Sequence, residues 1–145
     1  MRQSAERRTE VPFVLRLDEA FCLTGRFDLL YRDGAGRCFV LDFKTDRRAG
    51  SAAARVQDYY LLQQHAYGLA GARLLGERFA GVIFYFLRRG DEVVWEAGAE
   101  AVARAEAHLR AATARWAQYL RAGDFPQTPR AEYCAGCGYR SRCGR

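Results

Sequence analysis

The pattern of apolar and polar positions divides the first third of the chain into three expected strands. They span residues 11–17, 21–32 and 39–43. Residues 33–36, Asp-Gly-Ala-Gly, separate the last two strands and favour a tight turn, so an antiparallel hairpin is the simplest arrangement. If the last three residues of this turn form the loop, Asp33 pairs with Arg37 and Asp28 falls directly opposite Asp42.

The rest of the chain alternates between helical and strand-like patterns. A helix is expected to begin at Asp58, as its N-cap, and to end near Leu75. The continuous apolar run 82–87 and the shorter run 93–95 indicate two more strands joined by a turn. A long amphipathic helix is expected over 99–122, closing before a glycine and a proline. Its apolar stripe consists of Val102, Ala105, Leu109, Ala112, Trp116 and Tyr119. Together these elements predict an α/β fold, a central mixed sheet of about five strands flanked by helices.

Other stretches have the pattern of surface. Residues 46–57 are expected to form a mobile loop, in which arginines contact phosphate or simply face solvent. These arginines are Arg47, Arg48 and Arg55. His108 lies off the apolar stripe and is expected at the surface, and neither it nor His65 has the sequence neighbours of a metal ligand.

Length and composition add limits to this picture. A chain of 145 residues with 50% hydrophobic residues suits one domain with a full core. We expect a flexible lead-in over 1–9, a core over 10–125 and a cysteine-rich tail over 126–145. The net charge of +6 is compatible with a polyanionic partner. Because no apolar run has membrane-spanning length and no signal-peptide pattern is present, we expect a cytoplasmic protein with no membrane partner.

One lysine changes the functional picture. Lys44 is the only lysine among 23 lysine and arginine residues, which indicates a position that needs a compact point charge. Asp42 precedes it by two strand positions and therefore shares its face. If Asp28 is opposite Asp42, their Cβ atoms lie roughly 4.5 to 5.5 Å apart, and the two carboxylates need a cation between them. Lys44 and a divalent ion such as Mg²⁺ can meet that need. An acid pair with a lysine salt bridge explains the same residues without a metal.

Three short motifs occur in order along the chain. They are Gly25-Arg26-Phe27-Asp28, Leu41-Asp42-Phe43-Lys44-Thr45-Asp46 and Gln63-Gln64-His65-Ala66-Tyr67. They resemble the GxxD, (D/E)xK and QxxxY motifs of the PD-(D/E)XK nucleases. They are most similar to the RecB-like nuclease domain at the C-terminus of helicase-nucleases such as RecB, AddA, AddB and AdnAB. The resemblance implies a restriction-endonuclease-like core and a Mg²⁺- or Mn²⁺-dependent DNA nuclease, an exonuclease rather than an endonuclease. It also implies DNA repair or recombination with a helicase partner.

The same resemblance suggests roles for individual residues. Asp28 and Asp42 would hold the metal, and Lys44 would position water and offset charge on the phosphate. Gln63 and Tyr67, four apart on one helix face, would help to hold the nucleic acid and the metal shell. A further acid, Glu10, matches a glutamate that stands just before the first strand in such domains. It would lie near the metal, or it is a solvated acid at a strand end.

The C-terminal tail contains a second candidate metal site. Its thiols are Cys134, Cys137 and Cys143. Three thiols so close together indicate a metal, since a disulfide is not expected in a reducing cytosol. In the family that the chain resembles, such a triplet and one upstream cysteine hold a [4Fe-4S] cluster. Zn²⁺ is the alternative. Cys22 and Cys38 are poor substitutes for the upstream cysteine because both lie in expected strands.

Relatives of this kind also carry a histidine ligand before the first strand, and this sequence has none there. We therefore expect the chain alone to be a weak nuclease, joined in its native form to a partner, most simply a helicase. Two other functions fit the sequence. One is a catalytically inactive DNA-binding or scaffold domain of a helicase complex, and the other is a zinc-binding DNA module. The intact Asp28, Asp42, Lys44 and Gln63 favour the nuclease.

Overall fold

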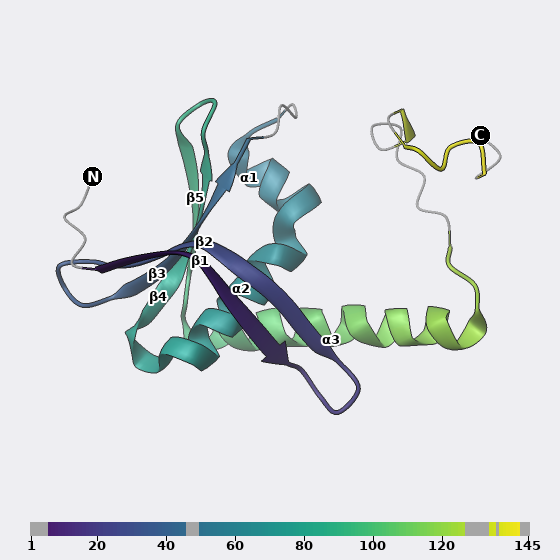
Figure 1. The fold of residues 1–145 in the computed structure, drawn as a ribbon, viewed down its shortest axis with the longest axis horizontal. Helices are drawn as coiled ribbons and strands as arrows, with labels where there is room; N and C mark the ends of the chain where they lie inside the picture. The colour runs from purple at the N-terminus through teal and green to yellow at the C-terminus, as the bar shows by residue number, and fades with distance from the viewer. Residues whose placement is uncertain (1–5, 46–49, 127–133, 136, 143–145) are drawn as a thin grey trace. The chain divides into compact units, whose positions relative to one another are not determined.

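The computed structural model describes residues 6–45, 50–126, 134–135 and 137–142, and it contains one five-stranded sheet in the order β1-β2-β3-β4-β5 (Figure 1). The strands are β1 (Glu6–Arg16), β2 (Cys22–Arg32), β3 (Cys38–Lys44), β4 (Phe79–Phe86) and β5 (Asp91–Glu96). β3 and β4 run parallel, and the other neighbouring pairs are antiparallel. The sheet is therefore mixed, and the predicted α/β class is confirmed.

The helices are α1 (Ala52–Arg55), α2 (Leu61–Leu75) and α3 (Ala99–Ala122), with a π-helical turn, Val56–Tyr60, between the first two. The loop expected over 46–57 is thus wrong from Ala52 onward. The hydroxyl of Ser51 caps α1 by accepting a hydrogen bond from the amide of Ala54 at 3.2 Å. Asp58, expected as an N-cap, lies inside the π-helical turn. Alanine and arginine form helices without an apolar stripe, so the sequence pattern concealed α1.

The first strand is longer than expected. β1 begins at Glu6, which is opposite Arg32, so residues 6–9 of the predicted lead-in belong to the sheet. All four have exposed side chains. They show no alternation of apolar and polar residues because this end of β1 buries nothing.

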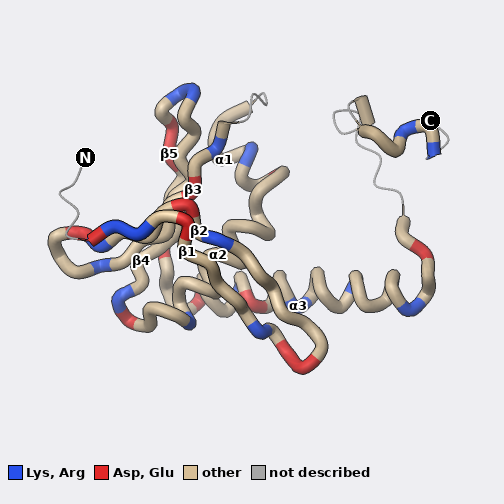
Figure 2. Tube along the Cα trace, viewed as in Figure 1, with Lys and Arg blue, Asp and Glu red and all other residues tan. Residues whose placement is uncertain are grey.

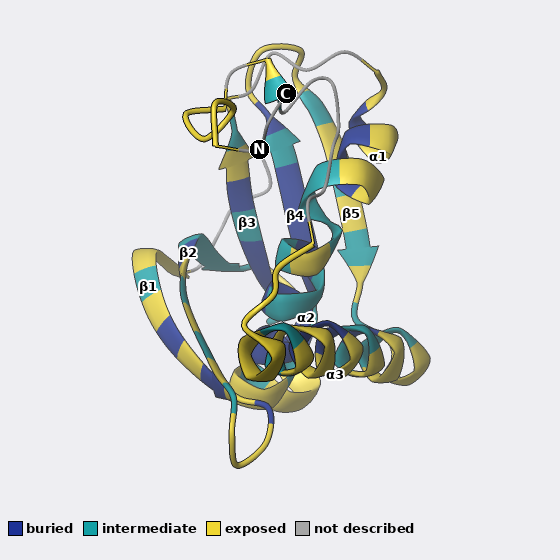
Figure 3. Cartoon of the chain, turned by 90° about the vertical axis from the view of Figure 1, so that its right-hand side faces the viewer, coloured by how far each residue is buried: buried dark blue, intermediate teal, exposed yellow. Residues whose placement is uncertain are grey.

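The core lies between the sheet and α2, which packs against β3 and β4 (Figure 3). Its most deeply buried large side chains are Phe27, Val40, Leu69, Val82, Phe84 and Phe86. Gly68 of α2 explains how closely the helix approaches the sheet, since a Cβ there would lie 2.7 Å from the ring of Trp95. Close packing of this kind fixes the position of α2 over the strands.

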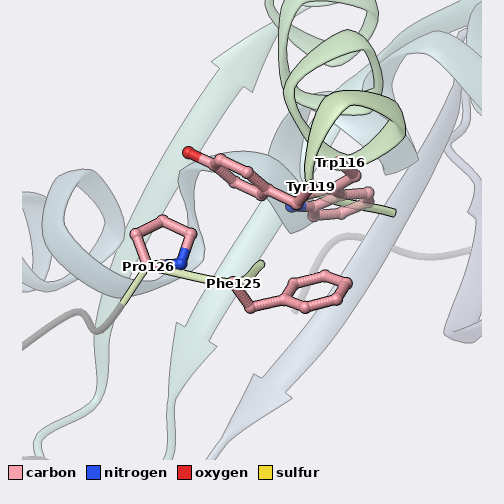
Figure 4. A pocket seen from close by; sticks show the side chains of 4 residues that line it. All are labelled: Trp116, Tyr119, Phe125 and Pro126. Atoms are coloured by element: carbon pink, nitrogen blue, oxygen red, sulfur yellow. The ribbon is translucent and has the colours of Figure 1, made fainter. Parts of the chain in front are cut away.

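The chain divides into two compact units, residues 1–112 and 113–145. The boundary falls inside α3, ahead of the predicted start of the tail at residue 126. In the first unit the predicted stripe of α3 is buried at Ala105, Leu109 and Ala112. In the second unit Trp116 is 46% exposed. It borders a hollow that is also lined by Tyr119, Phe125 and Pro126 (Figure 4).

Among the described residues, no helix combines the length and the apolar character needed to cross a membrane.

Candidate active site

The predicted pairing of β2 with β3 is confirmed, and it ends just before Asp28. The register runs from Arg32 opposite Cys38 to Leu29 opposite Leu41, and it includes the predicted turn. Asp28 and Asp42 come next in this register but are not paired through their backbones. Instead the Asp28 carboxylate accepts a hydrogen bond from the amide of Phe43 at 2.9 Å. Asp28 therefore stands where the two strands separate, and its side chain replaces a backbone partner.

The pairing of β1 with β2 is interrupted at the same level. The ladder omits one pair, Glu10 with Asp28, and Glu10 has a left-handed backbone with φ 53°. Phe27 and Leu30 both contribute to the core although they are three residues apart, which strict alternation along a strand does not allow. β2 thus changes the face that it turns to the core here, opposite the left-handed residue of β1, and Asp28 lies beside the end of β3.

Asp42 and Lys44 project from β3 toward α2. The Lys44 Nζ atom lies 2.6 Å from Oδ2 of Asp42, and it donates to Oε1 of Gln63 at 2.6 Å. Asp42 is 3% exposed and the Lys44 side chain 10% exposed. An acid and a base that share one strand face are therefore held together below the surface, as the sequence predicted.

Gln63 and Tyr67 reach the same place from α2. The Gln63 amide donates to Oδ1 of Asp42 at 3.1 Å and to the hydroxyl of Tyr67 at 2.9 Å. Tyr67 in turn donates to the backbone carbonyl of Arg26 at 2.8 Å. The amide is thus fixed with its oxygen toward the lysine and its nitrogen toward the carboxylate. We call Asp42, Lys44, Gln63 and Tyr67 the Lys44 cluster.

Burial and charge set the electrostatics of this cluster. Burial raises the pKa of Asp42, while Lys44 lowers it and the charge of Asp28 raises it further. Burial also raises the pKa of Tyr67 to about 12, and the charges of Asp42 and Asp28 act in the same direction against a lowering by Gln63. Tyr67 is therefore a neutral hydrogen-bond donor near pH 7. The Lys44 ammonium pairs with Asp42, and the charge of Asp28 acts on the same carboxylate, so the two acids outnumber the one base and the site favours another cation.

The two carboxylates fit a hard divalent ion. Oδ2 of Asp42 is buried and has no aligned hydrogen bond, although the Lys44 ammonium lies 2.6 Å away. Such an oxygen is a ready metal ligand, and Mg²⁺ binds through one or two carboxylates while it keeps several waters. No group of three His, Cys, Asp or Glu side chains converges among the described residues. Asp28 and Asp42 would thus be the protein's side-chain ligands, with water or substrate completing the shell.

Glu10 does not join the Lys44 cluster. It lies within β1 rather than before it, and its exposed carboxylate forms an ion pair with Arg26 at 3.1 Å. These contacts match the interpretation as a solvated strand acid.

Arg55 does not fit the expected contact with phosphate. It is 3% exposed, lies 3.8 Å from the Asp91 carboxylate and stacks over the Phe86 ring at 4.1 Å. Arg55 lies in α1, a helix that the sequence pattern did not reveal, and its side chain points into the protein rather than toward solvent. Arg47 and Arg48 lie outside the described residues.

The candidate thiol site is described only in part. The amide of Cys137 donates to the carbonyl of Cys134 at 3.4 Å, so these two residues share a turn, and Cys143 lies outside the described residues. Cys22 and Cys38 lie in β2 and β3, as the sequence predicted.

Sequence reasoning missed two features near α2. His108 is not an isolated surface residue, because its Nδ1 lies 2.8 Å from Nδ1 of His65, and one ring donates while the other accepts. Burial, followed by the charges of His108 and Arg104, lowers the pKa of His65. The second feature is Tyr60, whose ring centroid lies 4.2 Å from the Lys44 ammonium. Its spacing of three residues before Gln63 on a helical segment was the available signal.

Comparisons with known proteins agree with this geometry. The family described as the PD-(D/E)XK nuclease superfamily matches residues 1–144. No curated protein matches the sequence. Among solved structures, the crystal structure of SSO0001 is similar, with a TM-score of 0.54 and 18% sequence identity. The similarity covers 94% of this chain and 60% of that one, and at this identity it concerns the fold alone.

Proposed function

Because the chain belongs to the PD-(D/E)XK nuclease superfamily, we propose that it is a Mg²⁺- or Mn²⁺-dependent nuclease that hydrolyses phosphodiester bonds in DNA. One observation carries this proposal. A buried carboxylate, a second carboxylate, a lysine and an amide meet at one place although they come from β2, β3 and α2. Burial raises the pKa of Asp42, and buried ionisable groups with shifted pKa values cluster at functional sites, which supports the proposal.

In this proposal Asp28 and Asp42 hold the divalent ion. When bound, such an ion lowers the pKa of a water molecule and offers positive charge to the phosphate. The protein contributes the geometry. The bond from the Phe43 amide holds Asp28 in place at 2.9 Å, and the Gln63 amide does the same for Asp42 at 3.1 Å. Both carboxylates are therefore oriented before a substrate arrives, which lowers the entropic cost of the reaction.

Lys44 supplies a positive charge that does not depend on the ion. Its ammonium carries three N–H donors. One donates to Gln63 at 2.6 Å, and the charge forms an ion pair with Asp42 at 2.6 Å. A remaining donor is suited to an oxygen of the scissile phosphate, where negative charge grows during hydrolysis. Gln63 fixes the ammonium because its oxygen accepts from Lys44 while its nitrogen is committed elsewhere.

The choice of DNA, of exonuclease action and of a role in repair comes from the resemblance to RecB-like domains. The net charge of +6 is compatible with a polyanionic substrate. A catalytically inactive scaffold is the alternative, and the complete Lys44 cluster weighs against it.

The test is a cleavage assay on single-stranded oligonucleotides, linear duplex and closed circular DNA, with Mg²⁺, with Mn²⁺ and with a chelator. We expect cleavage only with a divalent ion, and cleavage of linear substrates but not of closed circles. The Asp42→Asn variant, purified in parallel, controls for contaminating nucleases. Equal cleavage by this variant, or no cleavage of any substrate by the wild-type chain, contradicts the proposal.

We also propose that the tail thiols bind a metal and that the chain works beside a helicase. Support for the metal is the close spacing of Cys134 and Cys137 on one turn. Support for the helicase is the resemblance alone. Iron, sulfide and zinc should be measured on anaerobically purified protein. Iron with sulfide supports the cluster, and stoichiometric zinc supports the alternative. Protein that contains neither metal would refute the metal site. Copurification from native cells tests the helicase partner.

A further inference from the structure

Two aromatic rings enclose the ammonium of the only lysine. The Lys44 Nζ atom lies 4.2 Å from the ring centroid of Tyr60 and 4.7 Å from that of Phe84. Phe84 is fully buried in β4, directly opposite Asp42 in the parallel ladder. Tyr60 is half-buried and comes from the helical side. The ammonium thus lies between β4 of the sheet and the π-helical turn that precedes α2.

The backbone presents the Tyr60 ring in an unusual way. Tyr60 is the last residue of the π-helical turn, and its φ of −120° and ψ of 2° depart from helical values before α2 begins. Turns of this kind are rare in proteins, and those that occur are often found at functional sites, because they change which side chains of a helix face inward. Tyr60 and Gln63, three residues apart, approach the ammonium from the same segment. The Tyr60 ring also packs edge-on to Phe84 at 6.0 Å, which fixes its plane.

We propose that Tyr60 is a positioning residue for Lys44: the face of its ring holds the ammonium between Asp42 and Gln63. The effect on catalysis rests on the proposed nuclease function, whereas the contact itself does not.

The chemistry of the ammonium explains why a ring serves here. The negative face of an aromatic ring attracts a cation, and it does so most effectively where water is excluded. A polar side chain at this position would accept a hydrogen bond from the remaining N–H of Lys44 and compete with a phosphate oxygen. The ring steadies the charge and excludes water while it leaves that donor to the substrate. The flexible lysine stem is therefore held in one arrangement before DNA binds.

A direct test uses the single lysine. Selective ¹³C labelling of lysine gives signals from Lys44 alone, so no assignment is needed. Ring currents of Tyr60 and Phe84 should move the Hε signals upfield. In Tyr60→Leu part of this displacement should disappear, and in Tyr60→Phe it should remain. Tyr59→Leu, a change in the same π-helical turn, is the matched control and should leave the signals in place. Tyr60→Met is a second variant without a ring, for use if Tyr60→Leu does not fold.

These spectra are recorded without metal and without DNA, so they do not depend on nuclease activity. Unchanged Hε signals in the folded ringless variant would overturn the proposal.

The kinetic arm then tests the consequence. In Tyr60→Leu we expect kcat to fall on the order of 10-fold with KM little changed, because displaced reacting groups slow the chemical step. Tyr60→Phe should restore the rate. If Tyr60 had a merely structural role, Tyr60→Leu and Tyr59→Leu would both lower thermal stability and leave kcat unchanged. That result would overturn the positioning role. If the wild-type chain cleaves nothing while the Hε signals respond as expected, the contact with Lys44 is supported and the nuclease function is contradicted.

Discussion

Two polar clusters tie α2 to its surroundings, and they use different cations. The Lys44 cluster is buried and contains one compact ammonium. Near the other end of α2 lies what we call the Glu106 cluster, Asp18, Arg73, Glu106 and Arg110. There Glu106 accepts from Arg73 at 3.0 Å and from Arg110 at 2.7 Å, and the side chains are 30–45% exposed.

The difference follows from the shape and hydration of the two cations. In the Glu106 cluster Arg73 also donates to the carbonyl of Arg16 at 2.6 Å, so one guanidinium serves two partners in half-exposed surroundings. In the Lys44 cluster two rings and an amide leave room for a point charge only. Basic residues occur on strands, turns and helices (Figure 2), yet a lysine was kept at just one position. We therefore expect the Lys44 cluster to serve the proposed function and the Glu106 cluster to serve stability.

The sharpest test of this contrast is to exchange the cation. Lys44→Arg keeps the charge but adds a wide planar group between Tyr60, Phe84 and Gln63. We expect cleavage to fall at least about 100-fold in Lys44→Arg, as in Lys44→Ala, because the charge can no longer reach the phosphate in the same geometry. Initial rates and circular dichroism measure this. Wild-type rates in Lys44→Arg would show that any cation suffices.

The carboxylates provide the next test. Asp28→Asn and Asp42→Asn remove charge while an amide oxygen can still accept the bond from Phe43 or from Gln63. We expect Mn²⁺ affinity, measured by calorimetry, and cleavage both to fall on the order of 100-fold with the fold retained. Treatment with a chelator should reproduce the loss in the wild-type chain, and added Mn²⁺ should reverse it.

Asp33→Asn is the matched control for these variants. Asp33 is also buried, but it caps the hairpin turn by accepting from the amides of Ala35 and Arg37 at 2.9 and 3.0 Å. It should lower stability and leave Mn²⁺ binding and cleavage unchanged. If Asp33→Asn lost as much activity as Asp42→Asn, the losses would reflect folding rather than chemistry.

The Glu106 cluster should behave in the opposite way. In Glu106→Gln we expect the free energy of unfolding to fall by about 0.5–1 kcal/mol, since partly exposed ion pairs contribute little. This difference should shrink at high salt because mobile ions screen exposed charges. Cleavage should stay within about twofold of wild type, as the cluster does not touch the site. Urea titrations at two salt concentrations measure the first effect. A large loss of cleavage would mean that the two clusters are coupled through α2.

The sequence predicted the parts of the site that depend on interactions between residues close together in the chain. The turn residues set the register of β2 and β3, and strand parity placed Asp42 and Lys44 on one face. The spacing of four residues brought Gln63 and Tyr67 together. Each of these inferences needs only the geometry of one element or one hairpin, so the local sequence is enough to predict which of these side chains lie together.

Features that depend on tertiary packing were not predictable in this way. Counting paired positions from the turn assumes that the backbones of β2 and β3 stay paired throughout. It therefore could not reveal that the Asp28 side chain replaces a backbone partner. The contact between His65 and His108 joins two helices across 43 positions, and no periodicity links them. The ring of Tyr60 contacts Lys44 from the end of a π-helical turn. Its spacing before Gln63 indicates a shared side of the segment, but apolar periodicity does not encode a π-helical turn.

The smallest expected effect concerns His65, the third polar contact of α2, which meets α3 rather than the sheet. Burial, His108 and Arg104 lower the pKa of His65 from its ordinary value of 6.5. The unfolded chain therefore takes up a proton at higher pH than the folded chain. The contribution of His65 to stability is complete above about pH 6.5 and is lost as pH falls from there through the lowered folded value. Thermal unfolding between pH 8 and pH 5 should show this decline, and His65→Gln should flatten it without changing cleavage at pH 8. A decline of equal steepness in His65→Gln would assign the pH dependence to other groups and leave the contact between the two rings as packing alone.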